Sequence, residues 1–204
     1  MLNSPPFLQR IFLVRHGETT WSLSGQHTGR TDIPLTKKGE EDARKLNERL
    51  RTTVFNRVFT SPLQRARQTA ALAALATPAE IDPDLAEWDH GEYEGLRTAE
   101  IRAIKPDWNL YQDGCPGGES PAQVSLRADR IIARLRTLDG DVAIFSHGHF
   151  GCVLAARWIG LDIEHALHFL LDTASLSILG YGHQSAAEPA IMLWNARPDE
   201  TPGP

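Results

Sequence analysis

The sequence has no run of apolar residues approaching the roughly 18 that a membrane-spanning helix needs. Its first segment, Met1 to Gln9, lacks the apolar core of a signal peptide. Cysteine is scarce, because the 204 residues contain only Cys115 and Cys152, too few for the disulfide framework of a small secreted fold. These absences predict a cytoplasmic protein with reduced thiols and no membrane partner.

An excess of positive charge is also missing. Lys and Arg number 21 against 26 Asp and Glu, so the formal net charge is -5, and no basic tract occurs. Nucleic-acid-binding proteins carry a basic patch, so we expect no nucleic-acid partner. The length and the 41% hydrophobic content suit a globular chain with a substantial core. We expect a single domain over 1–204, with flexible tails at about 1–8 and 197–204.

Two short apolar runs end abruptly at a histidine followed by glycine. Residues 11–14 precede Arg15-His16-Gly17, and residues 142–145 precede Ser146-His147-Gly148. Such runs predict buried parallel strands. Further strands are predicted at 58–60, 80–82, 176–181 and 191–194.

Helices are predicted at 37–51 after Thr36, at 121–135 after Ser120, and from 148 to about 160. A further helix is predicted at 62–75, with Ser61 as N-cap and Pro62 as its first residue.

This alternation of strands and helices predicts an α/β fold, a three-layer α/β/α sandwich with a mostly parallel central sheet. In open sheets of this kind, ligands bind at the carboxyl ends of the strands. His16, Arg65 and His147 are all predicted to lie at that edge. Three reactive side chains from separate segments would meet there, as an active site requires.

The same residues meet the chemical needs of phosphoryl transfer. Arg15 and Arg65 can hold phosphate oxygens in bidentate hydrogen bonds. A neutral His16 can attack phosphorus and form a covalent intermediate, while His147 stabilises charge on the equatorial oxygens. Glu87, in the polar and aromatic loop 85–96, can donate a proton to the leaving oxygen and later accept one from water.

Four ordered segments resemble the histidine phosphatase superfamily, also called phosphoglycerate mutase-like. They are the signature at 13–19, the segments 28–32 and 35–39, and the second-arginine segment at 60–70. Ser146 to Phe150 agrees with the same family. The resemblance covers nearly the whole chain. It implies a phosphohistidine at His16, a phosphate pocket completed by Arg15, Arg65 and His147, and Glu87 as the general acid. It also implies a substrate-binding role for four positions, which are Ser22, Gln26, Thr28 and Gly29.

Segments 87–95 and 113–120 more closely resemble the sedoheptulose-1,7-bisphosphatase and acid phosphatase branch. That resemblance implies a metal-independent phosphomonoester hydrolase acting on small phosphorylated metabolites, such as sugar phosphates or bisphosphates, with no cofactor. The glycines after the two histidines, Gly17 and Gly148, leave room for the backbone to approach the phosphate. The longer segment that follows the second histidine in the bisphosphatases is absent, so the metabolite stays open.

Other residues compete for these roles. Arg67 lies two helical positions from Arg65 and is expected to point outward. Glu92 and Glu94 compete with Glu87 as the acid, but Leu85 and Trp88 favour a desolvated Glu87. His149 suits a supporting or packing role, so we leave it out of the catalytic set.

The eight histidines do not predict a metal site. His147 and His149 have superficially suitable spacing, but no nearby cysteine or carboxylate completes a tetrahedral set, and the paired arginines would repel a cation.

Two other functions stay open. One is a cofactor-dependent phosphoglycerate mutase, although the interval from Trp88 to Ser146 is too short for the basic insertion of the family's mutases. The other is a non-enzymatic phospholigand-binding protein, which we would expect to have lost a catalytic residue. The sequence also leaves monomer and homodimer open, although the apolar C-terminal strands would suit a dimer surface.

Overall fold

The computed structural model describes residues 8–183 and 185–199. Within them, six strands form one sheet in the order β3-β2-β4-β1-β5-β6. The strands are β1 (Ile11–Arg15), β2 (Phe55–Thr60), β3 (Ala79–Ile81), β4 (Asp141–Ser146), β5 (Leu176–Tyr181) and β6 (Pro189–Ala196). The first four are mutually parallel, and β5 and β6 are antiparallel to their neighbours. The predicted mostly parallel sheet is confirmed.

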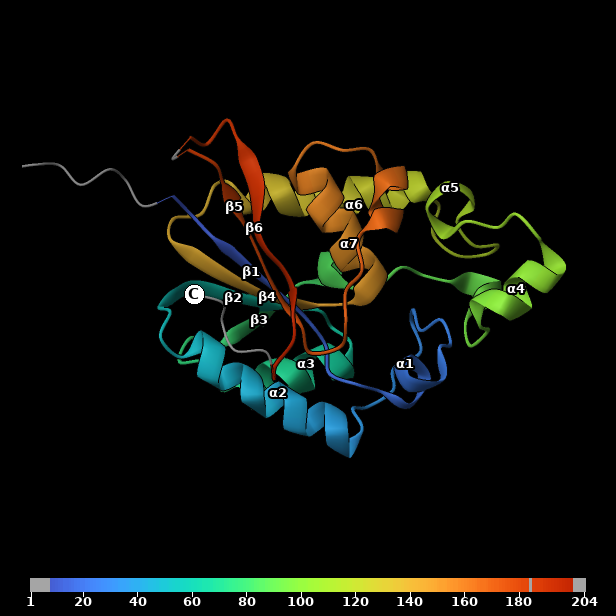
Figure 1. Ribbon diagram of the computed structural model, residues 1–204, viewed down its shortest axis with the longest axis horizontal. Coiled ribbons are helices and arrows are strands. Elements are labelled where there is room, and N and C mark those ends of the chain that lie inside the picture. Colours follow the sequence, from blue (N-terminus) through green and yellow to red (C-terminus); the bar gives the residue numbers. More distant parts are fainter. Residues whose placement is uncertain (1–7, 184, 200–204) are drawn as a thin grey trace, which may run out of the picture.

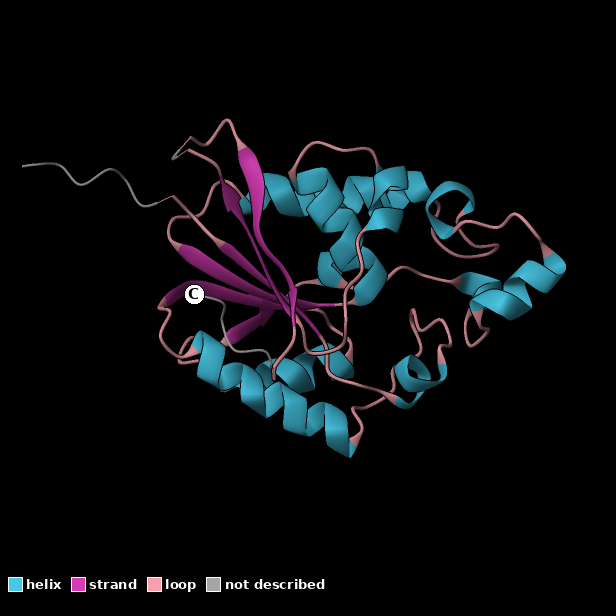
Figure 2. Cartoon of the chain, viewed as in Figure 1, coloured by secondary structure: helices cyan, strands magenta, loops and turns pink. Residues whose placement is uncertain are grey.

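Helices cover both faces of this sheet (Figure 1). Helices α2 (Lys37–Leu50) and α3 (Gln64–Ala73) lie on one face, and α6 (Pro121–Leu135) and α7 (Gly148–Trp158) on the other. Shorter helices occupy the connecting segments of Figure 2, namely α1 (Thr20–Ser24), α4 (Thr98–Ile104), α5 (Leu110–Asp113), and the 3-10 helices η1 (Pro83–Leu85), η2 (Gly91–Tyr93) and η3 (Ile163–His168). The chain therefore has the predicted three layers.

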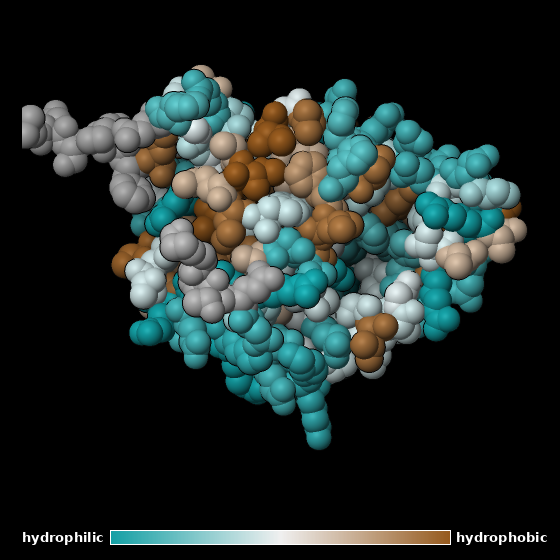
Figure 3. All heavy atoms as spheres, in the orientation of Figure 1, coloured by the Kyte–Doolittle hydropathy of each residue, from teal (hydrophilic) through white to brown (hydrophobic). Residues whose placement is uncertain are grey.

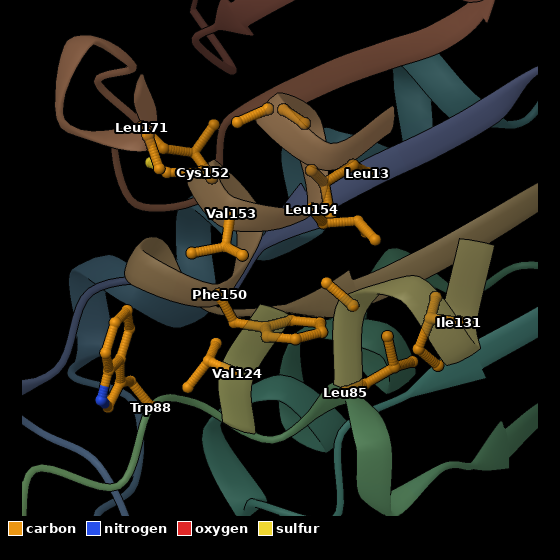
Figure 4. Close-up of a cluster of buried hydrophobic side chains, with 14 of the residues drawn as sticks. Leu13, Leu85, Trp88, Val124, Ile131, Phe150, Cys152, Val153, Leu154 and Leu171 are labelled. Carbon is orange, nitrogen blue, oxygen red and sulfur yellow. The ribbon is translucent and has the colours of Figure 1, made fainter. Parts of the chain in front are cut away.

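Strand β1 shows why the sheet is buried on both faces. Because successive side chains of a strand point to opposite faces, Ile11 and Leu13 enter the core under α6 and α7, whereas Phe12 and Val14 enter the core under α2 and α3. Figure 4 shows Leu13 in the first of these cores, with Phe150 of α7 among the side chains around it. Each fully buried apolar side chain contributes about 1.5–3 kcal/mol.

Helix α2 follows the sequence prediction closely. Thr36 is its N-cap, and the Thr36 hydroxyl accepts the backbone N–H of Gly39 at 3.0 Å. Ala43, Leu46 and Leu50, which recur at helical spacing, are all fully buried against the sheet. The periodic apolar face therefore decided both the existence and the orientation of this helix.

The predicted start of α3 is wrong. Neither Ser61 nor Pro62 begins the helix, which starts at Gln64 with Leu63 at the N-cap. Among backbone donors, the hydroxyl of Ser61 accepts the N–H of Leu63, at 3.2 Å, one residue before the helix begins. A carboxylate from a distant segment caps the helix instead, because Oδ1 of Asp32 accepts the Gln64 N–H at 2.7 Å. This contact depends on tertiary structure, so local sequence could not reveal it.

The predicted tails fall mainly outside the described residues, at 1–7 and 200–204. Residues 197–199 are described, and there Arg197 Nε donates to Asp172 at 2.8 Å while Lys45 Nζ donates to Asp199 at 2.6 Å. Among the helices of the described chain, none combines the length and apolar character that crossing a bilayer demands.

Candidate active site

The two predicted catalytic histidines lie side by side. Arg15 and Ser146 are paired in the register of the parallel strands β1 and β4, so the residues that follow them leave the sheet at the same edge. The rings of His16 and His147 are consequently 5.2 Å apart between centroids. Both side chains are buried, His147 completely. The fold therefore brings together two residues 131 positions apart in the chain.

The hydrogen bond of His16 identifies its reactive nitrogen. Nδ1 lies 2.7 Å from the carbonyl oxygen of Gly17, which can only accept, so Nδ1 carries the ring proton and Nε2 keeps a lone pair. Burial lowers the pKa of His16 well below 6.5, and the charges of Arg65 and Arg15 lower it further. At neutral pH His16 is thus an uncharged imidazole with a free Nε2.

Arg15 supplies an unused donor beside this histidine. Its Nη1 donates to the carbonyl of Leu171, whereas its buried Nε has no hydrogen-bond partner among the described residues. A Cβ at Gly148 would lie 3.2 Å from the Arg15 Cζ, so glycine at 148 leaves the guanidinium its space. A buried charged donor without a partner is suited to an incoming anion.

Arg65 occupies a different place from Arg15, because it is completely buried beneath the pocket. Its N–H groups donate to the carbonyl oxygens of Thr28 (3.2 Å), Gly29 (2.9 Å) and Thr31 (3.0 Å), and to Nδ1 of His147 (3.2 Å). The guanidinium therefore ties the 28–31 segment to the second histidine while it contributes positive potential to the pocket floor.

Glu87 is anchored at the start of α7. Its carboxylate accepts the backbone N–H groups of Trp88 (2.9 Å), His149 (3.0 Å) and Phe150 (2.8 Å). The last two belong to the first turn of α7, where backbone donors would otherwise lack partners. The predicted desolvation of Glu87 is confirmed, since the residue is 6% exposed. Trp88 is buried in the hydrophobic core, which fixes the loop.

A cavity of about 350 Å³ opens over these groups. Its walls include most of the predicted site residues, namely Arg15, His16, Ser22, Gln26, Thr28, Glu87 and Gly148. Arg65, His147 and Gly29 do not line it. Arg65 and His147 lie deeper, and Gly29 packs against backbone, where a Cβ would come within 2.5 Å of the Trp88 carbonyl oxygen.

The predicted substrate-binding side chains already have partners in the free protein. The Ser22 hydroxyl accepts the Thr19 N–H at 2.8 Å and donates to the Thr19 carbonyl at 3.0 Å, closing a capping box on α1. Gln26 donates to the carbonyl of Gly95 at 2.8 Å, and the Thr28 hydroxyl donates to the carbonyl of Gln26 at 3.2 Å. These bonds hold the pocket wall in shape before a ligand arrives.

The structure explains the need for glycine at position 17 differently from the sequence. A Cβ on Gly17 would collide with the backbone of Gly39, and a Cβ on Gly39 would collide with the backbone of Glu18. The missing side chain therefore allows the loop after β1 to pack against the first turn of α2. Close approach of backbone to backbone, rather than of backbone to ligand, accounts for this glycine.

The competing residues lie away from the cavity. Arg67 and Glu92 are exposed, as expected. Glu94 is half-buried, and its Oε1 accepts the N–H groups of Gly29 (2.8 Å) and Thr31 (2.9 Å). Glu94 thus stabilises a loop, and among these three carboxylates only Glu87 lines the cavity.

Sequence reasoning missed Arg127, which holds the Glu87 loop in place. Its guanidinium donates to the carbonyl oxygens of Asp84 (2.9 Å) and Ala86 (2.6 Å), and forms a salt bridge with Glu119 at 2.8 Å. Arg127 as a whole is 7% exposed. Its signal was present, because Arg127 lies on the apolar face of the predicted helix 121–135, where a charge needs a partner.

Sequence reasoning also missed a histidine cluster. His149 lies with His27 and His90, and one ring nitrogen of each lies within 4.8 Å of those of the other two. In the sequence, His147 and His149 are the pair with spacing suited to a metal. The structure instead groups His149 with two residues from other loops, which no local spacing could indicate.

Comparisons with known proteins identify the relatives of this chain. The sequence model of the histidine phosphatase superfamily, branch 1, matches residues 11–197. An acid phosphatase of Mycobacterium tuberculosis is 43% identical over 178 residues, which cover 85% of this chain and 87% of that protein. Sedoheptulose 1,7-bisphosphatase of Saccharomyces cerevisiae is 33% identical over 253 residues, with 93% of each chain covered.

Solved structures show the same likeness. A structure from Mycobacterium tuberculosis superposes with a TM-score of 0.88 at 38% identity, covering 93% of this chain and 98% of the other. A putative alpha-ribazole-5'-P phosphatase of Escherichia coli superposes with a TM-score of 0.81 at 29% identity, covering 94% and 98%.

Proposed function

Because the chain belongs to the histidine phosphatase superfamily and is a phosphatase, we propose that it hydrolyses small phosphate monoesters through a phosphohistidine at His16. One observation carries this proposal. The Nδ1 proton of His16 is engaged by the Gly17 carbonyl, so the neutral ring offers Nε2 as a nucleophile beside the unpartnered Nε of Arg15. A lone pair and an anion donor are thus adjacent in one cavity.

The first chemical step transfers the phosphoryl group to the enzyme. Nε2 of His16 attacks phosphorus in line with the ester oxygen, and the P–O bond breaks as the P–N bond forms. Arg15 binds the phosphate oxygens from the cavity wall, and Arg65 adds positive potential from below. Glu87 donates a proton to the departing oxygen.

The second step returns the enzyme to its starting state. Glu87, now ionised, accepts a proton from a water molecule as that water attacks phosphorus. The P–N bond breaks, inorganic phosphate leaves, and His16 regains its free Nε2. Apart from substrate and water, every group in this cycle belongs to the protein, so the proposed hydrolysis uses no metal or cofactor.

For the substrate, we propose sugar phosphates or molecules of similar polarity. Hydroxyl and amide groups of Ser22, Gln26, Thr28 and Thr98 contribute to the cavity wall, and such groups pair well with sugar hydroxyls. The relative named sedoheptulose 1,7-bisphosphatase supports this class.

A second phosphate has little to bind it. Of the described residues that line the cavity, Arg15 is the one with a permanent positive charge. The distal phosphate of a bisphosphate would therefore lie in solvent at the cavity mouth. We expect a sugar monophosphate and the matching bisphosphate to have kcat/KM values within about tenfold of each other, since an exposed ion pair contributes about 1 kcal/mol or less.

The deciding experiment measures phosphate release with EDTA present from sedoheptulose 1,7-bisphosphate, fructose 1,6-bisphosphate, its monophosphate, 3-phosphoglycerate and p-nitrophenyl phosphate. We expect His16→Ala to reduce kcat by at least about 10³-fold. Mass spectrometry of rapidly quenched wild type should find an acid-labile phosphate on His16. His168→Ala, at an exposed histidine, is the matched control.

Hydrolysis that persists in His16→Ala would overturn the mechanism. Conversion of 3-phosphoglycerate to an isomer without net phosphate release would instead establish the mutase. Saturable phosphate binding without turnover of any substrate would establish a phospholigand-binding protein.

We propose further that the chain is one domain, since all six strands join one sheet and the family match extends over 11–197. A cytoplasmic location is supported by two buried free cysteines, Cys115 and Cys152. The test for location is fractionation of the native host.

A homodimer through the free edge of β6 is the proposed assembly. Hydrophobic side chains gather beside β5 and β6 on the face shown in Figure 3, whereas the surface over α2 is hydrophilic. Met192 of β6 is 57% exposed. Light scattering after size exclusion should give twice the 22.6 kDa chain mass, and a single chain mass would refute the dimer.

A further inference from the structure

Three histidines from separate segments converge beside the active-site cavity, which His27 and His149 line and the fully buried His90 does not. His27 follows α1, His90 precedes η2, and His149 is in the first turn of α7. Their ring centroids are 4.9 Å (His27 to His90), 5.1 Å (His90 to His149) and 5.4 Å (His27 to His149) apart. None of the three takes part in the proposed hydrolysis. The cluster therefore needs its own explanation.

In His27 and in His90, one ring nitrogen has a hydrogen-bond partner and the other has none among the described residues. His27 Nε2 lies 3.1 Å from the Thr98 hydroxyl, and His90 Nδ1 lies 3.7 Å from the Cys115 thiol. The opposite nitrogens, His27 Nδ1 and His90 Nε2, are buried and have no partner among the described residues. Leaving a buried polar atom unpaired costs about 1–3 kcal/mol, so an occupant that pairs with both nitrogens would stabilise the fold.

This pattern matches the way proteins prepare histidines for a metal. A ligating imidazole normally uses its second nitrogen in a supporting hydrogen bond, which fixes the ring and its tautomer. Three imidazoles on one side, with a fourth position open to solvent or substrate, form the usual open zinc site. Ligand nitrogens about 2.0–2.1 Å from zinc lie about 3.4 Å apart in a tetrahedron. The ring nitrogens of the three histidines, which lie within 4.8 Å of one another, need only a small inward shift to reach that spacing.

The surrounding charge also permits a cation. Glu87 Oε2 lies 3.9 Å from Nδ1 of His149 and provides a negative charge beside the cluster. It offsets the positive charge of Arg15, which shares the cavity wall. The sulfur of Cys115 stays behind His90, where it supports the ring.

We propose that His27, His90 and His149 bind Zn²⁺, or another divalent transition metal that favours imidazole, with the fourth coordination position open to the active-site cavity. Imidazole ligation suits Zn²⁺, Cu²⁺, Ni²⁺ and Co²⁺ rather than Mg²⁺ or Ca²⁺, which prefer oxygen. The site is separate from the catalytic machinery but shares its cavity, since His27 and His149 both line it.

Occupancy of this site inhibits the phosphatase, a consequence that rests on the function proposed above. His27 and His149 both line the cavity, so bound metal would narrow it there and hinder entry of the phosphate ester. The metal is therefore a regulator of hydrolysis and takes no part in it.

The first test measures metal binding without reference to activity. Metal-free wild type is titrated with Co²⁺ and Zn²⁺ by calorimetry, and the visible spectrum of the Co²⁺ form is recorded. We expect one metal per chain at micromolar affinity and the strong absorption of tetrahedral Co²⁺. His90→Asn should lose this binding, whereas the surface double variant His165→Ala/His168→Ala should keep it.

If His90→Asn fails to fold, a second variant and a crystal structure still test the site. Thr98→Val, which removes the partner of His27 Nε2, should weaken Zn²⁺ binding by about 10-fold or more. Crystals grown with Zn²⁺ should show an anomalous peak between the three imidazoles. An absent peak, or binding that follows His165 and His168 instead, would overturn the site.

The inhibition is tested separately on the same proteins. Zn²⁺ at concentrations that fill the site should reduce phosphate release by wild type at least about 10-fold, and EDTA should restore it. His90→Asn should be active without metal and resist Zn²⁺. Metal binding without inhibition would keep the site and refute its regulatory role. Absence of phosphatase activity in every protein would refute the proposed function and leave the binding result intact.

Discussion

Arg65 Nε lies 3.2 Å from Nδ1 of His147. A guanidinium can only donate, so this nitrogen of His147 must be the acceptor and the ring proton must be on Nε2. Nε2–H in turn donates to the hydroxyl of Ser61 at 2.7 Å. Burial lowers the pKa of His147 well below 6.5, and Arg65 lowers it further, which keeps the ring neutral. One arginine therefore fixes the tautomer of the second histidine.

The first prediction concerns Ser61, the other partner of this histidine. Ser61→Ala removes the acceptor of His147 Nε2–H, so the ring loses its fixed orientation. We expect kcat to fall by about 10-fold with little change in KM, and the free energy of unfolding to fall by about 1 kcal/mol. Steady-state kinetics and urea unfolding check both. Ser185→Ala, in the turn between β5 and β6, is the control, and an unchanged kcat in Ser61→Ala would contradict the prediction.

The second prediction separates the acid role of Glu87 from a structural role. In Glu87→Gln, kcat/KM for a sugar phosphate should fall by about 10²–10⁴-fold, because an alkoxide leaves poorly without a proton. For p-nitrophenyl phosphate, whose phenolate leaves unaided, the loss should stay below about 10-fold. The exposed Glu92→Gln should match wild type on both substrates. Equal losses on the two substrates would show that Glu87 serves structure alone.

The third prediction is a pH dependence that arises from His16. Its pKa is lowered well below 6.5 in the folded protein by burial and by the two arginines. The unfolded chain therefore binds the extra proton first as pH falls below 6.5. The contribution of His16 to stability is complete above pH 6.5 and is lost at about 1.4 kcal/mol per pH unit below it, until the folded-state pKa is reached.

Urea unfolding between pH 5 and 7 tests this on wild type and His16→Gln. Below pH 6.5, the free energy of unfolding of His16→Gln should fall with decreasing pH less steeply than that of wild type. The two slopes should differ by about 1.4 kcal/mol per pH unit. Exposed His168→Gln should keep the wild-type slope. The kcat/KM of wild type should also show no loss near pH 6.5 attributable to protonation of the nucleophile. Parallel stability curves for wild type and His16→Gln would refute the assignment.

The fourth prediction concerns the backbone contact beneath the first histidine. Gly39→Ala should destabilise the protein by about 3 kcal/mol, because the new Cβ collides with the backbone of Glu18. Gly160→Ala is the control for conformational strain alone. Gly160 has a φ of 81° with no atom within 4 Å of a Cβ, so its cost should be about 1–2 kcal/mol. Thermal and urea unfolding compare the stability of the two variants. A loss of stability in Gly39→Ala smaller than that in Gly160→Ala would contradict the steric argument.

The sequence by itself determined the elements that have a local signature. The apolar runs at 11–14 and 142–145 became β1 and β4, and the periodic face of Ala43, Leu46 and Leu50 became α2. Since carboxyl ends of parallel strands share an edge, the sequence also indicated that His16 and His147 would meet.

Tertiary structure alone decided the contacts between segments that have no local signature. The start of α3 depends on Asp32, and the placement of Glu87 depends on backbone donors of α7. The meeting of His27, His90 and His149 depends on how two loops pack against the first turn of α7. Periodicity reports which face of an element is buried, but which polar atoms meet across loops is fixed only when the whole chain packs.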